Sequence, residues 1–443
     1  MEEIRRRPIA VPKERDATLA FFFLVLYTIS VLIRPHEFSI ETSNYIFIKV
    51  FAILSFLLAL VSLRPIQLGS QHIYFLVFPV LIIVSGFLNG WGMGGIDQAE
   101  RFFISSLIPF FLFSNLTRTA NRQHILFYVC ISAALIMVLN GHNQQQSFDG
   151  RFGYGIGGSL TVAGEEMRIT YLGFFGDPND LGMFLVMNVP IAFYFLKRGN
   201  AFSKLFFIGV LAALVYGIYM TGSRGTLLGI FGLCAIYFLV NNAGAKFVLF
   251  SVIMAPLVAT LLASFGGLTS ADSSAMGRLD AWYDGIHMLL GNPILGVGMS
   301  NFMDLHGKVA HNSYIHVAAE LGIIGYSIWG GALMLNMIAG YVLIKKFEKR
   351  GQDEQSDIST QELGINKTLF FSMVGFMITA FFLSRQFTLL MFIFLGMQTA
   401  SNYRIVKLSP ELSYLMSFKQ FAYCAMYSWV AIIMVYIALK IGL

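Results

Sequence analysis

Residues 203–220 read SKLFFIGVLAALVYGIYM and residues 226–241 read TLLGIFGLCAIYFLVN, and only TGSRG lies between them. An apolar run of about 17 to 25 residues is long enough for a helix to cross the ~30 Å hydrocarbon core of a membrane. The two runs therefore predict a pair of transmembrane helices joined by a tight turn. The arginine in that turn, Arg224, stands at or just below one membrane surface.

The same pattern extends over the whole chain. Of its 443 residues, 56% are hydrophobic and 12% are charged, whereas a soluble domain has roughly 25% charged residues. We therefore expect an all-α integral membrane protein, one polytopic membrane domain over 1–443 with about 12–14 transmembrane helices. The apolar runs lie near 17–33, 45–63, 72–88, 101–116, 124–140, 180–196, 203–220, 226–241, 247–264, 313–344, 368–383, 386–400 and 420–440.

The basic residues predict the orientation, because short loops rich in Lys and Arg stay in the cytoplasm. Arg5, Arg6 and Arg7 precede the first run, which places the N-terminus inside. Alternation then gives two sizeable outer loops, 141–179 and 265–312, and a charged inner segment, 345–367, that we interpret as a solvated linker. With thirteen spans the C-terminus lies outside. The net charge of +6 follows from these inner loops and does not indicate nucleic-acid binding.

The second outer loop contains an amphipathic pattern that begins at Arg278 and stops before Gly291-Asn292-Pro293. Its apolar residues recur at helical spacing, so we expect a short helix whose apolar face lies on the membrane interface with Trp282 as an anchor. Asp280 and Asp284 lie elsewhere on that helix and are expected to be ordinary solvated acids.

Arginines on the outer side run against the positive-inside bias. The planar guanidinium of Arg224, between small residues, suits a phosphate or pyrophosphate. The alternative is an arginine whose charged end reaches the lipid headgroups, and Arg385 has the same two interpretations. Arg34 and Arg101 fit the lipid-facing alternative better. The outer arginines are Arg34, Arg101, Arg151, Arg168, Arg224, Arg278 and Arg385.

His311 directly precedes Asn312-Ser313-Tyr314 at the start of an apolar run. An imidazole accepts a proton near neutral pH, which activates a hydroxyl as a nucleophile, although a lone histidine near a helix start is often structural. His316 and Glu320, one turn apart, are spaced to pair with each other. The three cysteines fall within apolar runs, and no spacing of Cys or His predicts a metal site.

Three blocks of sequence, in order, resemble the O-antigen ligase and polymerase superfamily of bacterial envelope glycosyltransferases. The first block is GDPNDLGMFLVMNVP at 176–190 and the second is TGSRGTLLG at 221–229. The third is GRLDAWYDGIHMLLGNPILGVGMSNF at 277–302, followed by HNSYIHVAAELGIIG at 311–325. Together they cover about a third of the chain, and the many-span layout around them is also similar to the family.

The resemblance implies a GT-C-like membrane fold and metal-independent, inverting glycosyl transfer without a cofactor at the periplasmic face of the bacterial inner membrane. The donor would be an oligosaccharide on undecaprenyl pyrophosphate, and the acceptor another glycan. A flippase and a chain-length regulator would be partners, besides membrane lipids. Carried onto this chain, Arg224 and Arg278 bind the pyrophosphate and His311 is the general base. Further candidates are Arg385, Arg168, Asn312, Tyr314, His316, Glu320, Asp177 and Asn179.

Only nine residues separate Phe302 from Asn312, which leaves little room for a large acceptor-binding subdomain. We therefore favour a polysaccharide polymerase over a ligase that transfers to a lipid A core or another acceptor. A flippase or transporter of lipid-linked glycans would also use outer arginines, but it would need charges deep within several spans. A non-catalytic membrane scaffold is the remaining alternative.

Overall fold

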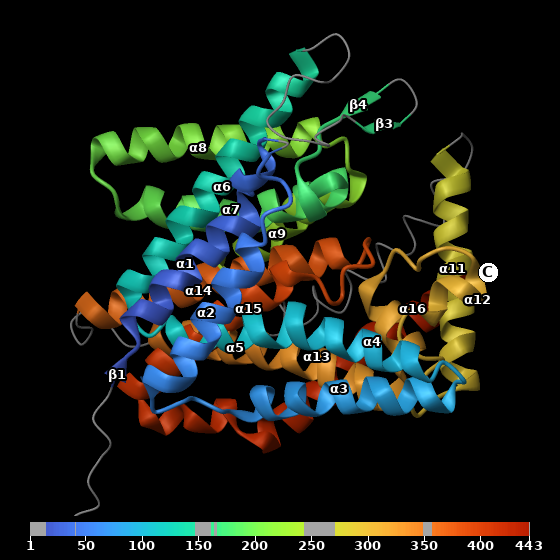
Figure 1. Ribbon diagram of the computed structural model, residues 1–443. Coiled ribbons are helices and arrows are strands. Elements are labelled where there is room, and N and C mark those ends of the chain that lie inside the picture. The colour runs from blue at the N-terminus through green and yellow to red at the C-terminus, as the bar shows by residue number, and fades with distance from the viewer. Residues whose placement is uncertain are drawn as a thin grey trace, which may run out of the picture.

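The computed structural model describes residues 15–39, 41–146, 161–163, 166–242, 271–348 and 357–442. Helices account for most of these residues (Figure 1). Two short antiparallel pairs join β1 (Arg15–Asp16) to β2 (Leu63–Arg64) and β3 (Thr161–Ala163) to β4 (Glu166–Arg168). The α-helices are α1 (Thr18–Leu32), α2 (Phe47–Ser62), α3 (Ser70–Leu88), α4 (Met93–Phe102), α5 (Ile108–Leu116), α6 (Ala120–Gln146), α7 (Pro178–Arg198), α8 (Ala201–Met220), α9 (Arg224–Asn242), α11 (Ala271–Gly291), α12 (Asn301–His306), α13 (Ser313–Glu348), α14 (Asp357–Ala380), α15 (Leu389–Leu408) and α16 (Phe418–Gly442).

The length and apolar character of the helices confirm an all-α integral membrane protein. Among the described residues, eight helices are long and apolar enough to cross a membrane, namely α3, α6, α7, α8, α9, α13, α14 and α16. Helices α1 and α2 are apolar but shorter. The run expected to cross at 247–264 lies outside the described residues, so the count of 12–14 stays a prediction.

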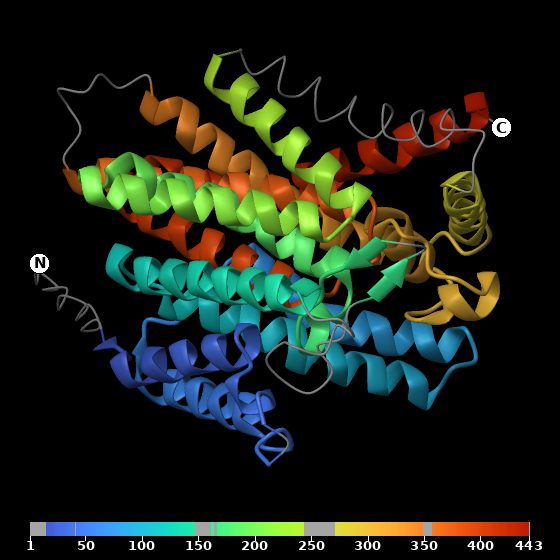
Figure 2. The same ribbon diagram turned by 90° about the horizontal axis from the view of Figure 1, so that it is seen from above.

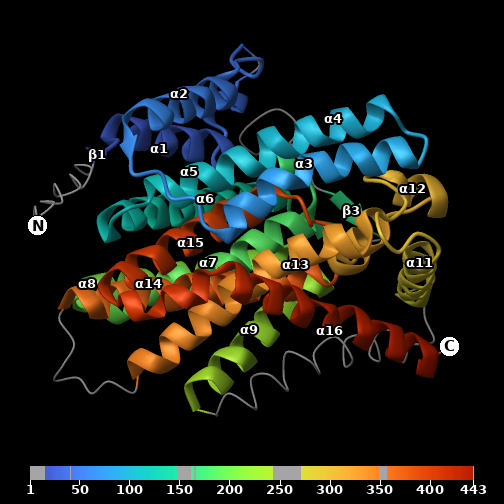
Figure 3. The ribbon, with the colours of Figure 1, turned by 90° about the horizontal axis from the view of Figure 1, so that it is seen from below.

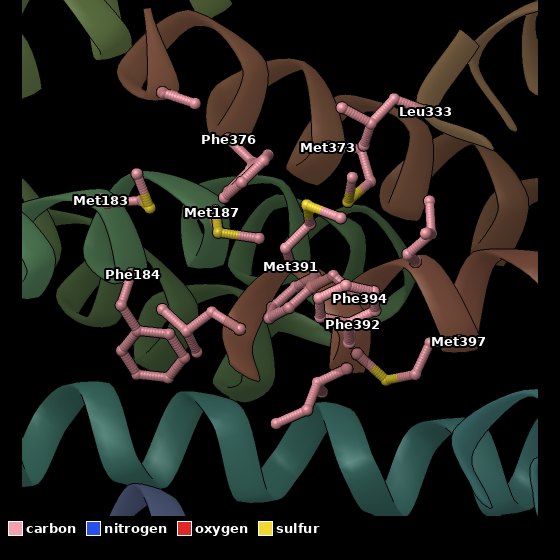
Figure 4. Packing of buried hydrophobic residues seen from close by; sticks show 14 of the residues in the cluster. Met183, Phe184, Met187, Leu333, Met373, Phe376, Met391, Phe392, Phe394 and Met397 are labelled. Carbon is pink, nitrogen blue, oxygen red and sulfur yellow. The ribbon is translucent and has the colours of Figure 1, made fainter. Parts of the chain in front are cut away.

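The centre of the bundle is packed with methionine and phenylalanine side chains from α7, α14 and α15, together with Leu333 of α13 (Figure 4). Such flexible and flat side chains fill the irregular spaces between crossing helices. Small residues allow the backbones of some neighbouring helices to approach each other closely. A Cβ on Gly182 of α7 would lie 2.2 Å from Oγ1 of Thr226, so this glycine allows the close approach of α9. The central side chains include Met183, Phe184, Met187, Leu333, Met373, Phe376, Met391, Phe392, Phe394 and Met397.

Helix α11 lies across one end of the bundle and runs crosswise to α3 and α13 (Figures 1 and 3). Helices α7, α9, α13 and α15 start at this end, and α8 and α14 finish there. The start of α1 lies at the opposite end of the molecule from the end of α16 (Figure 2). Below, we call the part of the bundle beside α11 the α11 end.

The apolar face of α11 corrects one expectation. The predicted amphipathic helix is present and ends at Gly291, but its face packs on α13 and α16 and not on a membrane interface. Trp282 is 1% exposed, and its Nε1 donates to the carbonyl oxygen of Ala310 at 2.9 Å. Leu290 is exposed and does not share the buried face. The segment that precedes His311 is therefore anchored to the bundle through this tryptophan.

Helix α13 is interrupted at Gly322, whose φ of 61° and ψ of −161° are not helical. A β-carbon is unfavourable in this conformation, and one on Gly322 would also lie 2.6 Å from the backbone of Ile294. The segment 293–298 fills the interruption. Its amides at Val297 and Gly298 donate to the carbonyls of Ala319 and Glu320 at 3.0 and 2.9 Å. The break thus joins the loop after α11 to the first turns of α13.

More of the segment 345–367 is helical than its charged composition predicts. Helix α13 continues to Glu348 and α14 begins at Asp357, so only 349–356 lie between them and outside the described residues. Glu362 explains part of the difference, since it is buried and accepts a hydrogen bond from Nε of Arg404 at 2.8 Å. Such a buried pair stabilises helical structure that a charged composition does not predict.

Candidate functional site

Of the helices that begin at the α11 end, α7, α9 and α13 have side-chain caps that form one connected group. Asp177 accepts from the amide of Asn179 at 2.8 Å before α7, and Ser223 accepts from the amide of Thr226 at 3.1 Å before α9. Asn312 accepts from the amides of Tyr314 and Ile315 at 3.0 and 3.1 Å before α13. Asp, Ser and Asn are preferred at such positions because they satisfy amides that a helix start leaves free. The caps fix where each helix begins.

Hydrogen bonds connect these helix starts to one another. Oγ of Ser223 donates to Oδ1 of Asn179 at 2.6 Å, which joins α9 to α7. Nε of Arg385 donates to Asp180, and its Nη2 lies 3.4 Å from Oδ2 of Asp177. These contacts join the α14–α15 connection to α7, so Arg385 holds the site together through two carboxylates.

The start of α13 is attached to the same connection. The hydroxyl of Ser313 donates to the carbonyl oxygen of Leu383 at 2.6 Å and accepts from the amide of Arg385 at 2.8 Å. Arg224 follows Ser223 and His311 precedes Asn312, so the two residues stand at opposite ends of one hydrogen-bonded frame. The frame includes Asp180, which the sequence analysis did not single out and which is 2% exposed.

Arg224 and Arg278 are the unpaired cations of this frame. Within the described ranges neither guanidinium makes a hydrogen bond or an ion pair, in contrast to Arg385. The two lie close enough to interact. Burial lowers the pKa of Arg278, and the positive charge of Arg224 lowers it further. Two uncompensated like charges side by side are unfavourable unless an anion binds between them.

His311 has a left-handed backbone with φ of 49°, which places it just outside the cap of α13. Part of the side chain is exposed, while protein surrounds the rest of it. This loss of hydration lowers the pKa of His311, and the charge of Arg278 lowers it further, whereas Asp177 opposes the change. The imidazole is therefore neutral at neutral pH and able to accept a proton.

Arg168 lies beside the turn that carries Arg224. Its Nε is buried and has no hydrogen-bond partner among the described residues, and a Cβ on Gly222 would lie 3.1 Å from it. The amide of Ile169 donates to the carbonyl of Met220 at 3.2 Å, which fixes this strand end to the turn. Arg168 is thus a third cation at the α11 end, next to the pair formed by Arg224 and Arg278.

The remaining predicted residues have contacts of their own. His316 and Glu320 pair as expected, with 3.0 Å between Nε2 and Oε1. The Tyr314 hydroxyl donates to the carbonyl of Met377 at 3.0 Å and therefore ties α13 to α14. Of the acids expected to be solvated, Asp284 has a side chain that is 49% exposed, and it also contacts Nδ1 of His306 at 2.6 Å. Arg34 binds Glu37, a local partner. Arg151 lies outside the described residues.

The described part of the chain contains no group of three or more His, Cys, Asp or Glu residues placed to hold a metal ion. The site is instead a set of cations beside a neutral histidine, the capping carboxylate of Asp177 and the buried carboxylate of Asp180. Anion binding on one side and proton acceptance on the other are the two chemical properties that this arrangement offers.

Comparison with known proteins agrees with this chemistry. Residues 208–330 match the family model described as O-antigen ligase, a segment that includes Arg224, Arg278 and His311. The resemblance noted in the sequence is thus confirmed over this part of the chain, and it supports an enzyme of the O-antigen ligase or polymerase type. A search of curated proteins gives no match.

Proposed function

We propose that this multi-pass membrane protein, with its O-antigen ligase segment, transfers a glycan from undecaprenyl pyrophosphate to a glycan acceptor at the periplasmic face of the bacterial inner membrane. The observation that carries the proposal is the position of Arg224 and Arg278. The two arginines lie near each other, Arg278 also lies near His311, and neither arginine has a protein anion for a partner within the described residues.

The donor's pyrophosphate supplies the missing anion. Arginine binds phosphate oxygens through two parallel N–H donors, so two guanidinium groups can neutralise the two charges of a diphosphate diester. The same charges stabilise the pyrophosphate when it departs with both electrons of the C–O bond. The donor side of the reaction therefore needs positioned cations.

On the acceptor side, an acceptor hydroxyl attacks the anomeric carbon as the bond to pyrophosphate breaks. The neutral imidazole of His311 accepts the hydroxyl proton. A single displacement of this kind inverts the anomeric configuration. The frame that joins the start of α13 to the start of α9 holds the base and the anion ligands in one geometry, which is the main requirement for a reaction between two bound substrates.

A polymerase, whose acceptor is another lipid-linked unit, is the form of this activity that we favour. The connection between Phe302 and Asn312 is short, and α12 uses part of it. Phe302 itself is buried against His316, at 5.0 Å between ring centroids. The start of the segment thus packs on α13, and the nine residues that follow are too few for a large acceptor-binding subdomain, which favours a polymerase.

The test is transfer by the purified full-length protein in lipid vesicles containing a synthetic lipid-linked oligosaccharide. One arm offers the same lipid-linked unit as the acceptor, and the other offers a lipid A core. Polymer in the first arm supports a polymerase, whereas product only in the second identifies a ligase. Movement of the donor across the bilayer without a new glycosidic bond would identify a flippase and overturn the proposal.

A further inference from the structure

Ser384, His316 and Glu320 form a hydrogen-bonded row behind the frame. Nδ1 of His316 lies 3.0 Å from Oγ of Ser384, and its Nε2 lies 3.0 Å from Oε1 of Glu320. Glu320 is 2% exposed and also accepts from the amide of Phe302 at 3.2 Å. His316 is buried against the ring of Phe302, whereas Ser384 is only half-buried. The row therefore runs from a buried carboxylate to a serine that is only half-buried.

The chemistry of the partners determines where the hydrogen atoms lie. A carboxylate has only acceptor atoms, so Nε2 of His316 must carry the hydrogen of the contact with Glu320. In the neutral ring, Nδ1 is then an acceptor, and the hydroxyl hydrogen of Ser384 must point at it. Ser384 consequently presents only lone pairs to the rest of its surroundings.

Ser384 belongs to the connection that is bonded to the start of α13, next to His311. The next residue, Arg385, donates its amide to Ser313 at 2.8 Å, and Ser313 is two residues from His311. The charge of Arg385 acts on His311 as well. An oxygen that offers only lone pairs repels a phosphate and attracts a hydroxyl hydrogen, so it belongs to the acceptor side of the site and not to the side of Arg224 and Arg278.

We propose that Ser384 binds a hydroxyl of the acceptor glycan beside the one that reacts, and that His316 and Glu320 are positioning residues that keep the Ser384 oxygen in this accepting state. The inference rests on the proposed transfer reaction and adds to it a contact that selects the acceptor. Ser384 would orient the acceptor sugar, so that the correct hydroxyl meets His311.

The matched variants are Ser384→Thr and Ser384→Val, which have nearly the same shape and differ in the hydroxyl. Both are measured as the full-length protein in vesicles, with the acceptor concentration varied at saturating donor. We expect Val to raise the KM for the acceptor about two- to tenfold, the effect of one lost neutral hydrogen bond, and Thr to restore it. The KM for the donor stays at the wild-type value, since the arginines are unaltered.

His316→Gln tests the row behind the serine, because the glutamine amide nitrogen can replace Nε2 as the donor to Glu320, whereas the side chain has no acceptor at the Nδ1 position that contacts Ser384. Its acceptor KM should rise as in Ser384→Val, and the double variant should show no further increase, as expected for residues that act through one contact. An unchanged acceptor KM in Ser384→Val, or additive effects in the double variant, would overturn the inference. Absence of transfer by the wild type would instead count against the proposed function.

Discussion

Arg385 donates to Asp180, a carboxylate whose side chain is 3% exposed, and this pair joins the connection between α14 and α15 to the start of α7. The two carboxylates also determine the direction in which the pKa of the guanidinium shifts. Burial acts to lower the pKa of Arg385, but the charges of Asp180 and Asp177 outweigh it, and the pKa is raised. Arg385 is therefore a permanent cation that is already neutralised by protein, which distinguishes it from Arg224 and Arg278.

The first prediction concerns the stability of this clamp. Arg385→Ala leaves Asp180 buried without its partner, so we expect a loss of about 1–3 kcal/mol in the free energy of unfolding, measured by thermal unfolding in detergent. Adding Asp180→Asn removes the unpaired charge and should recover part of the loss. If Arg385→Ala unfolds like the wild type and raises the KM for the donor, Arg385 is a substrate ligand and not a clamp.

The second prediction concerns the anion ligands. Arg224→Ala and Arg278→Ala should each reduce donor use about ten- to a hundredfold, because a hydrogen bond to a charged group contributes about 1.5–3 kcal/mol. Lys at either position should restore only part of the activity, since an ammonium lacks the two parallel donors of arginine. Wild-type rates of both alanine variants at limiting donor would show that the pyrophosphate binds elsewhere.

The third prediction concerns the base. His311→Ala should reduce transfer by ~10²–10⁴, the usual contribution of general-base catalysis, and leave donor binding nearly intact. His316→Ala serves as the comparison and should act mainly on the acceptor. We also expect wild-type activity to survive chelators, as the family resemblance implies. Full activity of His311→Ala together with loss in His316→Ala would transfer the role of base to His316.

The fourth prediction uses the charges around His311. The base acts as a neutral imidazole, so kcat/KM should fall at acid pH below its pKa, which lies under the ordinary value of about 6.5. Arg278→Gln removes a positive charge and raises that pKa, so the acid limb of the pH profile, where kcat/KM falls, moves to higher pH. Asp177→Asn removes a negative charge and moves the limb to lower pH. Shifts in the same direction, or no shift in either profile, would exclude His311 as the titrating group.

The fifth prediction is the orientation in the membrane. Cysteines introduced as Lys308→Cys and Gly155→Cys should react with an impermeant reagent in whole spheroplasts, because both loops are expected outside. Lys308 is exposed, whereas Gly155 lies outside the described residues. Cys234 is the exposed natural cysteine and is replaced by serine as the background. Protection of both new cysteines until the membrane is opened would reverse the predicted topology.

Much of the fold follows from the sequence because membrane spans depend on local composition. The runs at 203–220 and 226–241 correspond closely to α8 and α9. The orientation of α11 does not follow in this way, since an amphipathic face fits a membrane interface or another helix equally well. Only tertiary contacts show that Trp282 bonds to Ala310 inside the bundle.

The site residues likewise differ in whether the sequence alone reveals their role. Arg224 and Arg278 are recognisable in sequence because the positive-inside bias makes outer arginines unusual. The positive-inside bias does not distinguish an arginine that is free to bind a ligand from one that is paired with a protein carboxylate. The role of Arg385 therefore stayed open in the sequence. Asp180 and Ser384 gave no signal of their own. Each is next to a recognised residue or within a recognised block, and its role depends on partners about 70 or 200 positions away.

The capped starts of α7, α9 and α13 at the α11 end also set an electrostatic potential. Each α-helix carries about half a unit of positive charge at its N-terminus, so α7, α9 and α13 together place roughly one and a half units around the site. This charge belongs to backbone amides and remains when side chains are replaced. A variant without Arg224 and Arg278 should therefore still attract diphosphates weakly, with an attraction that weakens as salt is added. Part of the affinity for anions is thus due to the convergence of the N-termini of α7, α9 and α13. Experiments that replace side chains do not measure this part.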